Sequence, residues 1–168
     1  MSAVANSISL EEYLEQTYEP EREFISGELV PKPVGTLDHS HTAKIIELLL
    51  DEFARRGLGR AERELSIRKG DDVRIPDIVF FDVNASIERG ILIDPPMLCV
   101  EILSPSQYPS QLFAKCEAYH AWGVSYCWVV DPVKRCAWEY HKGQPVTLIN
   151  NKAPLTADQI QIQVAQIF

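Results

Sequence analysis

The chain has 168 residues, of which 46% are hydrophobic and 24% are charged. This balance excludes a disordered or fibrous class, and the length suits one domain that spans residues 1–168. The formal net charge of -8 at pH 7 argues against ready binding to nucleic acid, because such proteins usually present a basic surface to phosphate. A basic rim could offset this charge locally. It comprises Arg55, Arg56, Arg60, Arg63, Arg68 and Lys69.

The composition of the N-terminus and the cysteines bears on the compartment. Residues 1–10 contain neither the basic nor the apolar segment of a secretory leader, and no run approaches the ~20 apolar residues of a membrane span, so we expect a cytoplasmic protein. The cysteines form no C-x-x-C pair, and three of them lie in apolar segments. We therefore expect buried reduced thiols and no structural zinc site at Cys99, Cys116, Cys127 and Cys136.

The N-terminal third predicts a short helix, a hairpin and a long helix. Ser9 and Glu12 form a capping box that opens a helix over residues 10–16. Residues 22–30 are typical of a hairpin that turns at Ser26 and Gly27. Helical spacing of apolar residues predicts a helix over 41–57, which ends at a glycine.

The rest of the chain predicts a sheet. Residues 62–69 and 73–83 are expected to form two strands around a Gly-Asp-Asp turn, and residues 95–104 a third strand covered on both faces. A helix over 112–123 leads into a strand over 124–132, and a terminal hairpin pairs 135–141 with 145–150. The order predicts an α/β fold: a mixed β-sheet core flanked by helices, in the order α-β-β-β-α-β, with N-terminal and C-terminal hairpins.

Two carboxylates interrupt the core strands. The strand period places Asp77 on one face with Val79, and Glu101 on one face with Cys99. A buried ionised carboxylate must be protonated, paired or neutralised by a bound cation. Lys115, at the flank of the sheet-facing stripe of the second long helix, could reach either acid or a substrate phosphate.

Spacing alone leaves alternatives open for these three residues. A buried ion pair that ties the helix to the sheet is as good an interpretation as an active site. A pair of carboxylates could also serve as the acid and base of a glycosidase, but no sugar cleft is indicated by the sequence.

A resemblance favours nuclease chemistry. The chain contains Pro76-Asp77, then Glu101 within VEILSP, then Lys115, then the pattern Y-x-x-x-G-V-x-Y-x-W-V-V-D-P over residues 119–132. This ordered set resembles the PD-(D/E)xK nuclease superfamily. Within it the chain resembles the Uma-type family, known as "putative restriction endonucleases" and a domain of unknown function. The similarity runs from about Tyr13 to the terminal hairpin and includes FISGELV.

The resemblance implies a restriction-endonuclease-like core and a catalytic set of Asp77, Glu101 and Lys115. Position 103, where the superfamily has its lysine, holds Leu103, and the resemblance implies that Lys115 replaces it. Asp77 and Glu101, with a main-chain carbonyl near Ile102, would hold Mg²⁺ or Mn²⁺. Lys115 would stabilise the developing charge or orient the attacking water, and the substrate would be nucleic acid, with DNA favoured over RNA.

Auxiliary residues also follow from the resemblance. Glu28, in the family-like GELV, and His41, at the helix start, are candidates, and His39 competes with His41 for the same match. Both histidines are also interpretable as surface residues or a helix cap. Glu47 is expected to face solvent, opposite the apolar face of its helix.

A second hypothesis is a catalytically inactive nuclease-fold domain that serves in binding or interaction, which the negative net charge favours. Metal binding through Asp77 and Glu101 would distinguish an active nuclease from an inactive domain. Trp138 and Tyr140 would form a dimer face or belong to the core, and a homodimer would present two sites suited to cutting a duplex.

Overall fold

The structure, a computed structural model, describes residues 8–168, so residues 1–7, on which the expectation of no secretory leader mainly rests, lie outside it. A central sheet of six strands has the order β12-β11-β10-β9-β6-β3. Its strands are β3 (Arg60–Arg63), β6 (Ile78–Phe81), β9 (Leu98–Ile102), β10 (Tyr126–Asp131), β11 (Cys136–His141) and β12 (Thr147–Ile149). β9 and β10 are parallel and the other pairs are antiparallel, so the predicted mixed α/β sheet is confirmed.

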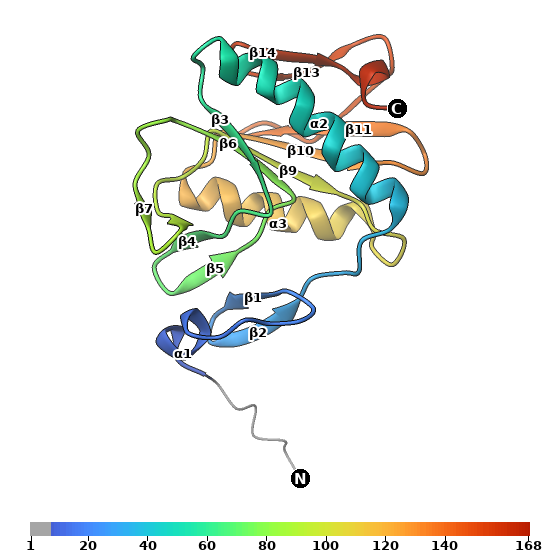
Figure 1. Cartoon of the computed structure of the whole chain (residues 1–168). Coiled ribbons are helices and arrows are strands. Elements are labelled where there is room, and N and C mark those ends of the chain that lie inside the picture. The colour runs from blue at the N-terminus through green and yellow to red at the C-terminus, as the bar shows by residue number, and fades with distance from the viewer. Residues whose placement is uncertain (1–7) are drawn as a thin grey trace.

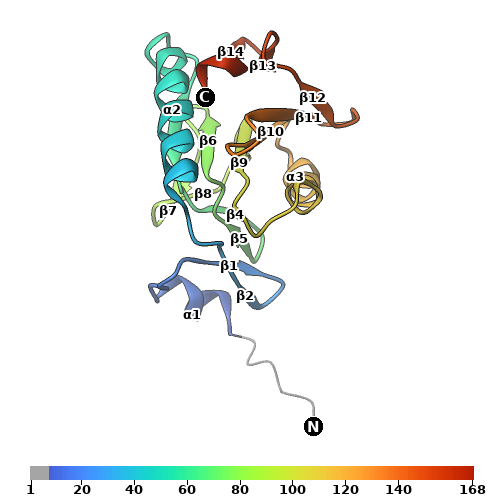
Figure 2. The same ribbon diagram turned by 90° about the vertical axis from the view of Figure 1, so that its right-hand side faces the viewer.

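Two helices cover opposite faces of the central sheet. α2 (Leu37–Arg55) lies on one side and α3 (Pro109–Trp122) on the other, as Figures 1 and 2 show. Along β9, Leu98, Val100 and Ile102 belong to the core beneath α2, whereas Cys99 packs beneath α3. This cover on both faces explains the nearly continuous apolar run of β9. It also places Glu101, by alternation, on the α3 side.

A second sheet lies beside the first, with the order β2-β1-β5-β4-β8-β7. Its strands are β1 (Arg22–Ile25), β2 (Glu28–Pro31), β4 (Ile67–Lys69), β5 (Asp72–Arg74), β7 (Ile87–Glu88) and β8 (Ile91–Leu92). The short helix α1 (Leu10–Leu14) packs on it through Tyr13, Phe24 and Val73. The capping box at Ser9 and the hairpin turn at Ser26 and Gly27 are as predicted.

The two strands expected over 62–69 and 73–83 are each divided between the two sheets. β3 and β6 belong to the central sheet, whereas β4 and β5 belong to the second. On the first arm Glu64 has a positive φ of 52°, and on the second arm Pro76 has no N–H to donate to a ladder. The long hairpin therefore bends, and Asp77 lies where the chain passes from one sheet to the other.

α2 begins four residues earlier than the apolar periodicity predicts. The hydroxyl of Thr36 accepts a hydrogen bond from the N–H of His39 at 3.3 Å and caps the helix. His39 consequently lies in the first turn of the helix. The C-terminal end is as predicted, with Gly57 at a φ of 81°.

The C-terminal segment after residue 150 contains elements that the sequence analysis did not predict. β13 (Pro154–Ala157) and β14 (Ile160–Gln163) form a hairpin, and the 3-10 helix η1 (Val164–Gln166) follows it. Leu155, Ile160 and Ile162 join the core beneath α2, so this hairpin extends the cover of the same sheet face.

The structure also shows where several smaller features of the sequence lie. All four cysteines are free, and Cys99, Cys116 and Cys127 are buried. Trp138 and Tyr140 are half-buried and pack against the core on the α3 side. Within residues 8–168, no helix combines the length and the apolar character that crossing a membrane requires.

Candidate active site

Buried negative charge is concentrated in one place. Within residues 8–168 the buried carboxylates are those of Glu23, Asp77, Glu101 and Asp131. Asp131 caps a turn by accepting two backbone N–H groups. Of the other three, Glu23 and Glu101 share Lys115, and Asp77 contacts Lys32 and His39. This clustering of costly groups is the structural reason to look for function there.

The register of the central sheet brings two of these acids together. Ile78 lies opposite Val100 in the antiparallel pair of β6 and β9. Asp77, which immediately precedes Ile78, is therefore next to Glu101 at the same end of neighbouring strands. Opposed residues in adjacent strands point to the same face, so both carboxylates approach the α3 side.

Asp77 is surrounded by donors. Its Oδ2 accepts the N–H of Ile102 at 2.7 Å and lies 3.2 Å from Nε2 of His39, while its Oδ1 lies 3.5 Å from Nζ of Lys32. Burial raises the pKa of Asp77, but the hydrogen bond with His39 and the charge of Lys32 outweigh it, so the pKa lies below its usual value. The same hydrogen bond raises the pKa of His39. The carboxylate of Asp77 therefore lies between the ammonium of Lys32 and the ring of His39.

Glu101 and Lys115 form a second, tighter arrangement. Nζ of Lys115 lies 2.9 Å from Oε1 of Glu101 and 2.9 Å from Oε1 of Glu23. The hydroxyl of Tyr119, one turn further along α3, donates to Oε1 of Glu101 at 2.6 Å. Burial raises the pKa of Glu101 to about 7, even though Lys115 opposes the shift. Burial lowers the pKa of Lys115, but the two carboxylates outweigh it, so the pKa lies above its ordinary value and the ammonium stays charged.

The N-terminal hairpin completes the cluster. Glu23 lies on β1, and its Oε1 also accepts the N–H of Ile75 at 2.8 Å. Lys32 follows β2, and its backbone N–H donates to the carbonyl of Glu21 at 3.0 Å. The second sheet therefore supplies one acid and one cation to a site whose other groups belong to the central sheet and its two helices.

A cavity of about 270 Å³ opens onto this cluster. Its wall combines the site residues with the loops that precede α2 and α3. The site residues in the wall are Lys32, His39, Asp77, Glu101, Ile102 and Lys115. The loop residues include Val34, Gly35, Ser104 and Gln107. A small substrate group, such as one phosphodiester, could therefore reach both Asp77 and Glu101.

The structure brings together three of the five residues suggested by the sequence. Asp77, Glu101 and Lys115 line the same cavity. Glu28, on β2, and His41, on α2, are exposed and are absent from the cavity wall. His39, the competing match, occupies the position beside Asp77 instead.

Four residues of the site are not among the five that the sequence suggested: His39, Tyr119, Glu23 and Lys32. Only His39 and Tyr119 carry a signal in the sequence. Thr36 is a strong N-cap residue, and a helix that starts at residue 37 places His39 in its first turn. Tyr119 lies one turn after Lys115 in the predicted sheet-facing stripe. Glu23 and Lys32 carry no such signal, because contacts distant in sequence bring them to the site. Glu47, which was set aside, is half-buried and pairs with Arg63 at 3.4 Å.

The residue types around the cavity fit a hard divalent cation. Asp77, Glu101 and the main chain at Ile102 supply the oxygen ligands that Mg²⁺ and Mn²⁺ prefer. Among residues 8–168, however, no three side chains of His, Cys, Asp or Glu are grouped as a ready-made metal site. Since Lys32 faces Oδ1 of Asp77, an ion bound through that oxygen requires the flexible lysine side chain to move.

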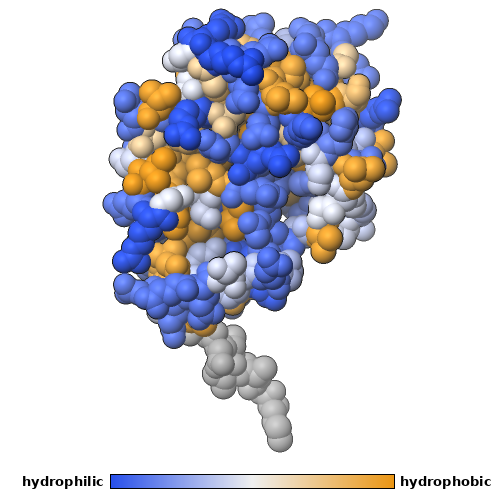
Figure 3. Space-filling view, in the orientation of Figure 1, coloured by the Kyte–Doolittle hydropathy of each residue, from blue (hydrophilic) through white to orange (hydrophobic). Residues whose placement is uncertain are grey.

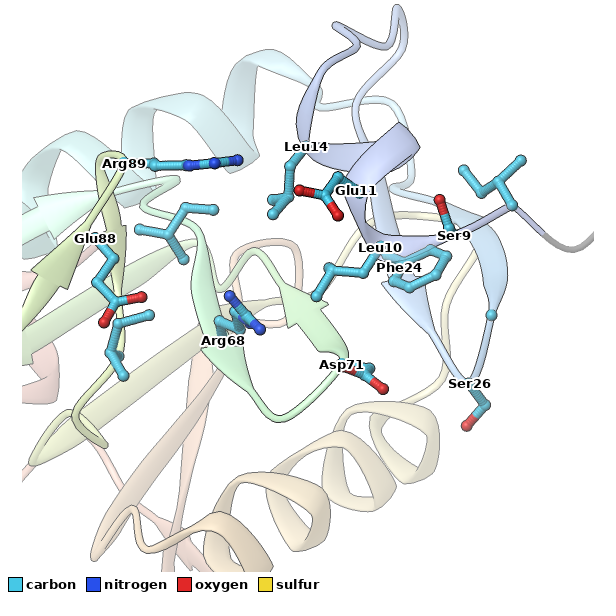
Figure 4. Close-up of a pocket in the computed structure, with 14 residues that line it drawn as sticks. Ser9, Leu10, Glu11, Leu14, Phe24, Ser26, Arg68, Asp71, Glu88 and Arg89 are labelled. Atoms are coloured by element: carbon cyan, nitrogen blue, oxygen red, sulfur yellow. The ribbon is translucent and has the colours of Figure 1, made fainter.

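A larger cavity of about 790 Å³ lies between α1 and the β7–β8 hairpin (Figure 4). This side of the molecule is rich in hydrophobic residues in the view of Figure 3. The charged residues that line the cavity are Glu11, Arg68, Asp71, Glu88 and Arg89. All of them except Arg68 are exposed, and none of the four buried carboxylates lies in its wall. The smaller cavity is therefore the candidate active site.

Comparisons with known proteins agree with this fold. The model of the Uma2 family, described as "Putative restriction endonuclease", matches residues 10–165. A solved structure from Anabaena variabilis ATCC 29413, described as a "putative nuclease belonging to DUF820", has a TM-score of 0.82 and 24% identity over 96% of this chain and 97% of that chain. At this identity the likeness shows the shared fold. No curated protein gives a match. Because the family match spans nearly the whole chain and contains every residue of the site, this protein belongs to the Uma2 family.

Proposed function

We propose that this protein is a metal-dependent nuclease that hydrolyses phosphodiester bonds in nucleic acid, with DNA as the favoured substrate. The family description and that of the Anabaena variabilis structure support the nuclease class. The observation that carries the proposal is the meeting of Asp77 and Glu101 in one cavity, with Lys115 2.9 Å from Glu101. This is the set that the resemblance to PD-(D/E)xK nucleases implies.

Asp77 and Glu101, with the main-chain carbonyl of Ile102, would hold Mg²⁺ or Mn²⁺. When bound there, the cation would supply a water molecule of lowered pKa for attack and would neutralise negative charge on the phosphate. The side chains of the protein fix the two carboxylates for this task. The N–H of Ile102 and the ring of His39 hold Oδ2 of Asp77.

Lys115 and Tyr119 act on Glu101 in the same way. Both contact Oε1, so the orientation of the carboxylate is fixed and Oε2 is left for other ligands. The apolar strands around the acids exclude bulk water, which strengthens each of these electrostatic interactions. Preorganisation of this kind lowers the cost of arranging the charged groups during reaction.

The proposal is tested by cleavage assays with DNA and RNA in the presence of Mg²⁺ or Mn²⁺. Asp77→Asn and Glu101→Gln should each reduce cleavage by at least ~100-fold while circular dichroism shows an unchanged fold. Asp131→Asn is a matched control, because it also alters a buried carboxylate but one that caps a turn and does not line the cavity. Cleavage that persists in both site variants would contradict the proposal.

One observation favours a second candidate, a nuclease-fold domain that binds without catalysis. Both acids already have a cationic partner, Lys32 for Asp77 and Lys115 for Glu101, so neither carboxylate depends on a metal for its pairing. Isothermal titration with Mn²⁺ separates the two candidates. The catalytic protein binds the ion, and Asp77→Asn abolishes the binding, whereas the inactive domain shows no such Asp77-dependent heat.

A further inference from the structure

The two lysines of the site differ in how completely their ammonium groups are satisfied. Nζ of Lys115 is held between two carboxylates at 2.9 Å each. Nζ of Lys32 is buried but has no hydrogen-bond partner within the described part of the chain. Its nearest acidic oxygens are Oδ1 of Asp77 at 3.5 Å and Oε2 of Glu21 at 3.9 Å. Lys32 therefore brings three donor hydrogens to the cavity wall and uses none of them.

An ammonium group in this state is costly, because burial removes its hydration and no hydrogen bond replaces it. The side chain of Lys32 is 12% exposed, so bulk water compensates for little of that loss. The side chain is nevertheless held near Asp77, since the backbone of Lys32 is bonded to the strand-entry loop at Glu21. The attraction of Asp77 at 3.5 Å and of Glu21 at 3.9 Å offsets this cost only in part, because both separations are longer than a good charged hydrogen bond.

The neighbouring groups determine what ligand the Lys32 ammonium could take. Oδ2 of Asp77 is engaged by Ile102 and His39, so Lys32 has only the attraction of Oδ1 at a distance longer than a good charged hydrogen bond. Lys32 and His39 flank Asp77 on the wall of the same cavity. An anionic group that approached Asp77 would meet the ammonium of Lys32 and the ring of His39 first.

Lys115 is poorly placed for that task. Its ammonium bridges Glu23 and Glu101 and is also about 6.0 Å from the ring centroid of Tyr119. A phosphate oxygen could capture Lys115 only by displacing one buried carboxylate from its partner, which is strongly unfavourable. Lys32 can reach a phosphate without breaking a hydrogen bond.

We propose that Lys32 contacts a non-bridging oxygen of the substrate phosphodiester, and that Lys115 is a positioning residue which holds Glu101. The inference rests on the proposed nuclease function and adds a phosphate ligand, from the N-terminal hairpin, to the three residues that the sequence suggested. It assigns the two lysines different tasks, which gives them different mutational signatures.

The experiment compares Lys32→Met, Lys32→Arg and Lys115→Met with the wild-type protein, and uses Lys44→Met, an exposed lysine of α2, as the control. Binding to short fluorescein-labelled oligonucleotides, single-stranded and duplex, is followed by anisotropy with Ca²⁺ over a series of KCl concentrations. Lys32→Met should reduce the slope of log K against log[salt] by about one and the affinity by about tenfold. Lys32→Arg should restore the slope, because it keeps the charge.

Unfolding in urea provides the second readout. Lys32→Met should lower the midpoint less than Lys115→Met does, because Lys32 lies 3.5 Å from one carboxylate that other donors also hold. Lys115→Met should lower the midpoint, because it leaves two buried carboxylates without their partner. Lys44→Met should change neither the slope nor the midpoint.

The outcomes that overturn the proposal are distinct from those that overturn the function. If the wild-type protein and Lys32→Met cleave and bind equally, the assignment of Lys32 is wrong and the nuclease proposal stands. If Lys32→Met lowers the urea midpoint and leaves the salt slope intact, Lys32 is a structural residue. If the wild-type protein neither binds nor cleaves any of the oligonucleotides, the proposed function fails and the role of Lys32 fails with it.

Discussion

Replacing Glu101 by glutamine should change how the stability of the protein depends on pH. In the folded protein burial raises the pKa of Glu101 from 4.5 to about 7. A carboxyl group whose pKa is raised by folding stabilises the folded state while it is protonated. That contribution is fully present below pH ~4.5 and is lost as the pH rises through ~7. Glutamine cannot titrate, but its amide oxygen can still accept from Lys115 and Tyr119.

The size of this change in stability follows from the shift in the pKa of Glu101. A difference of one pKa unit corresponds to about 1.4 kcal/mol, so the contribution of Glu101 should fall by about 2 to 3 kcal/mol between pH ~5 and pH ~8. No discount for solvent screening is required, because only 3% of the residue is exposed. The raised pKa of His39 contributes in the same direction, but it is common to both proteins and largely cancels in their difference.

The assay is urea unfolding of the wild-type protein and Glu101→Gln at several pH values across this range. The free energy of unfolding of the wild-type protein, relative to the variant, should fall by about 2 to 3 kcal/mol as the pH rises. A relative stability that stays constant would refute the reasoning. It would mean that Lys115 keeps Glu101 ionised throughout, so that burial is not the dominant cause.

Two further predictions concern stability. Lys115→Met should cost about 3 kcal/mol or more at pH ~8, because it leaves two buried carboxylates without their cationic partner, and a urea midpoint within error of the wild type would contradict the buried ion pair. Gly59→Ala should cost more than ~2 kcal/mol, because Gly59 has a φ of 154° and an added Cβ would lie 2.5 Å from the ring of Phe80. Gly143→Ala is its control: at a φ of 78° with nothing within 4 Å it should cost only about 1 kcal/mol, and equal losses for the two variants would show that crowding is unimportant.

The features of the fold that depend only on residues adjacent in the sequence could be predicted from that sequence. The two-residue turn at Ser26 and Gly27, the capping box at Ser9 and the glycine end of α2 all follow from local backbone requirements. The alternation along β9 was enough to put Glu101 on the α3 side of the sheet. Such features are readable because the residues that decide them are adjacent in the chain.

The parts that the sequence did not reveal depend on contacts between distant segments. The strand pattern over 73–83 continues through Pro76, but tertiary packing divides it between two sheets. Glu23 meets Lys115 across most of the chain, and its neighbour Phe24 is also buried, so alternation gives no hint of its role. The hairpin over residues 154–163 shows alternation along β14, and the sequence analysis did not predict it.

The structure also changes how the net charge of the protein bears on its proposed substrate. A basic rim could offset the charge of -8 locally, but two of its members are paired, Arg60 with Glu62 and Arg63 with Glu47. Inside the cavity, the ammonium of Lys32 and the ring of His39 flank Asp77.

A charge inside a cavity of low dielectric acts more strongly than one on an exposed rim, and salt screens it less. An acidic protein could thus engage one phosphodiester firmly while repelling the rest of the polymer. On this view the net charge limits the affinity for nucleic acid and leaves the chemistry at the bound phosphate intact. Replacing Lys32 should therefore reduce turnover far more than replacing any surface arginine.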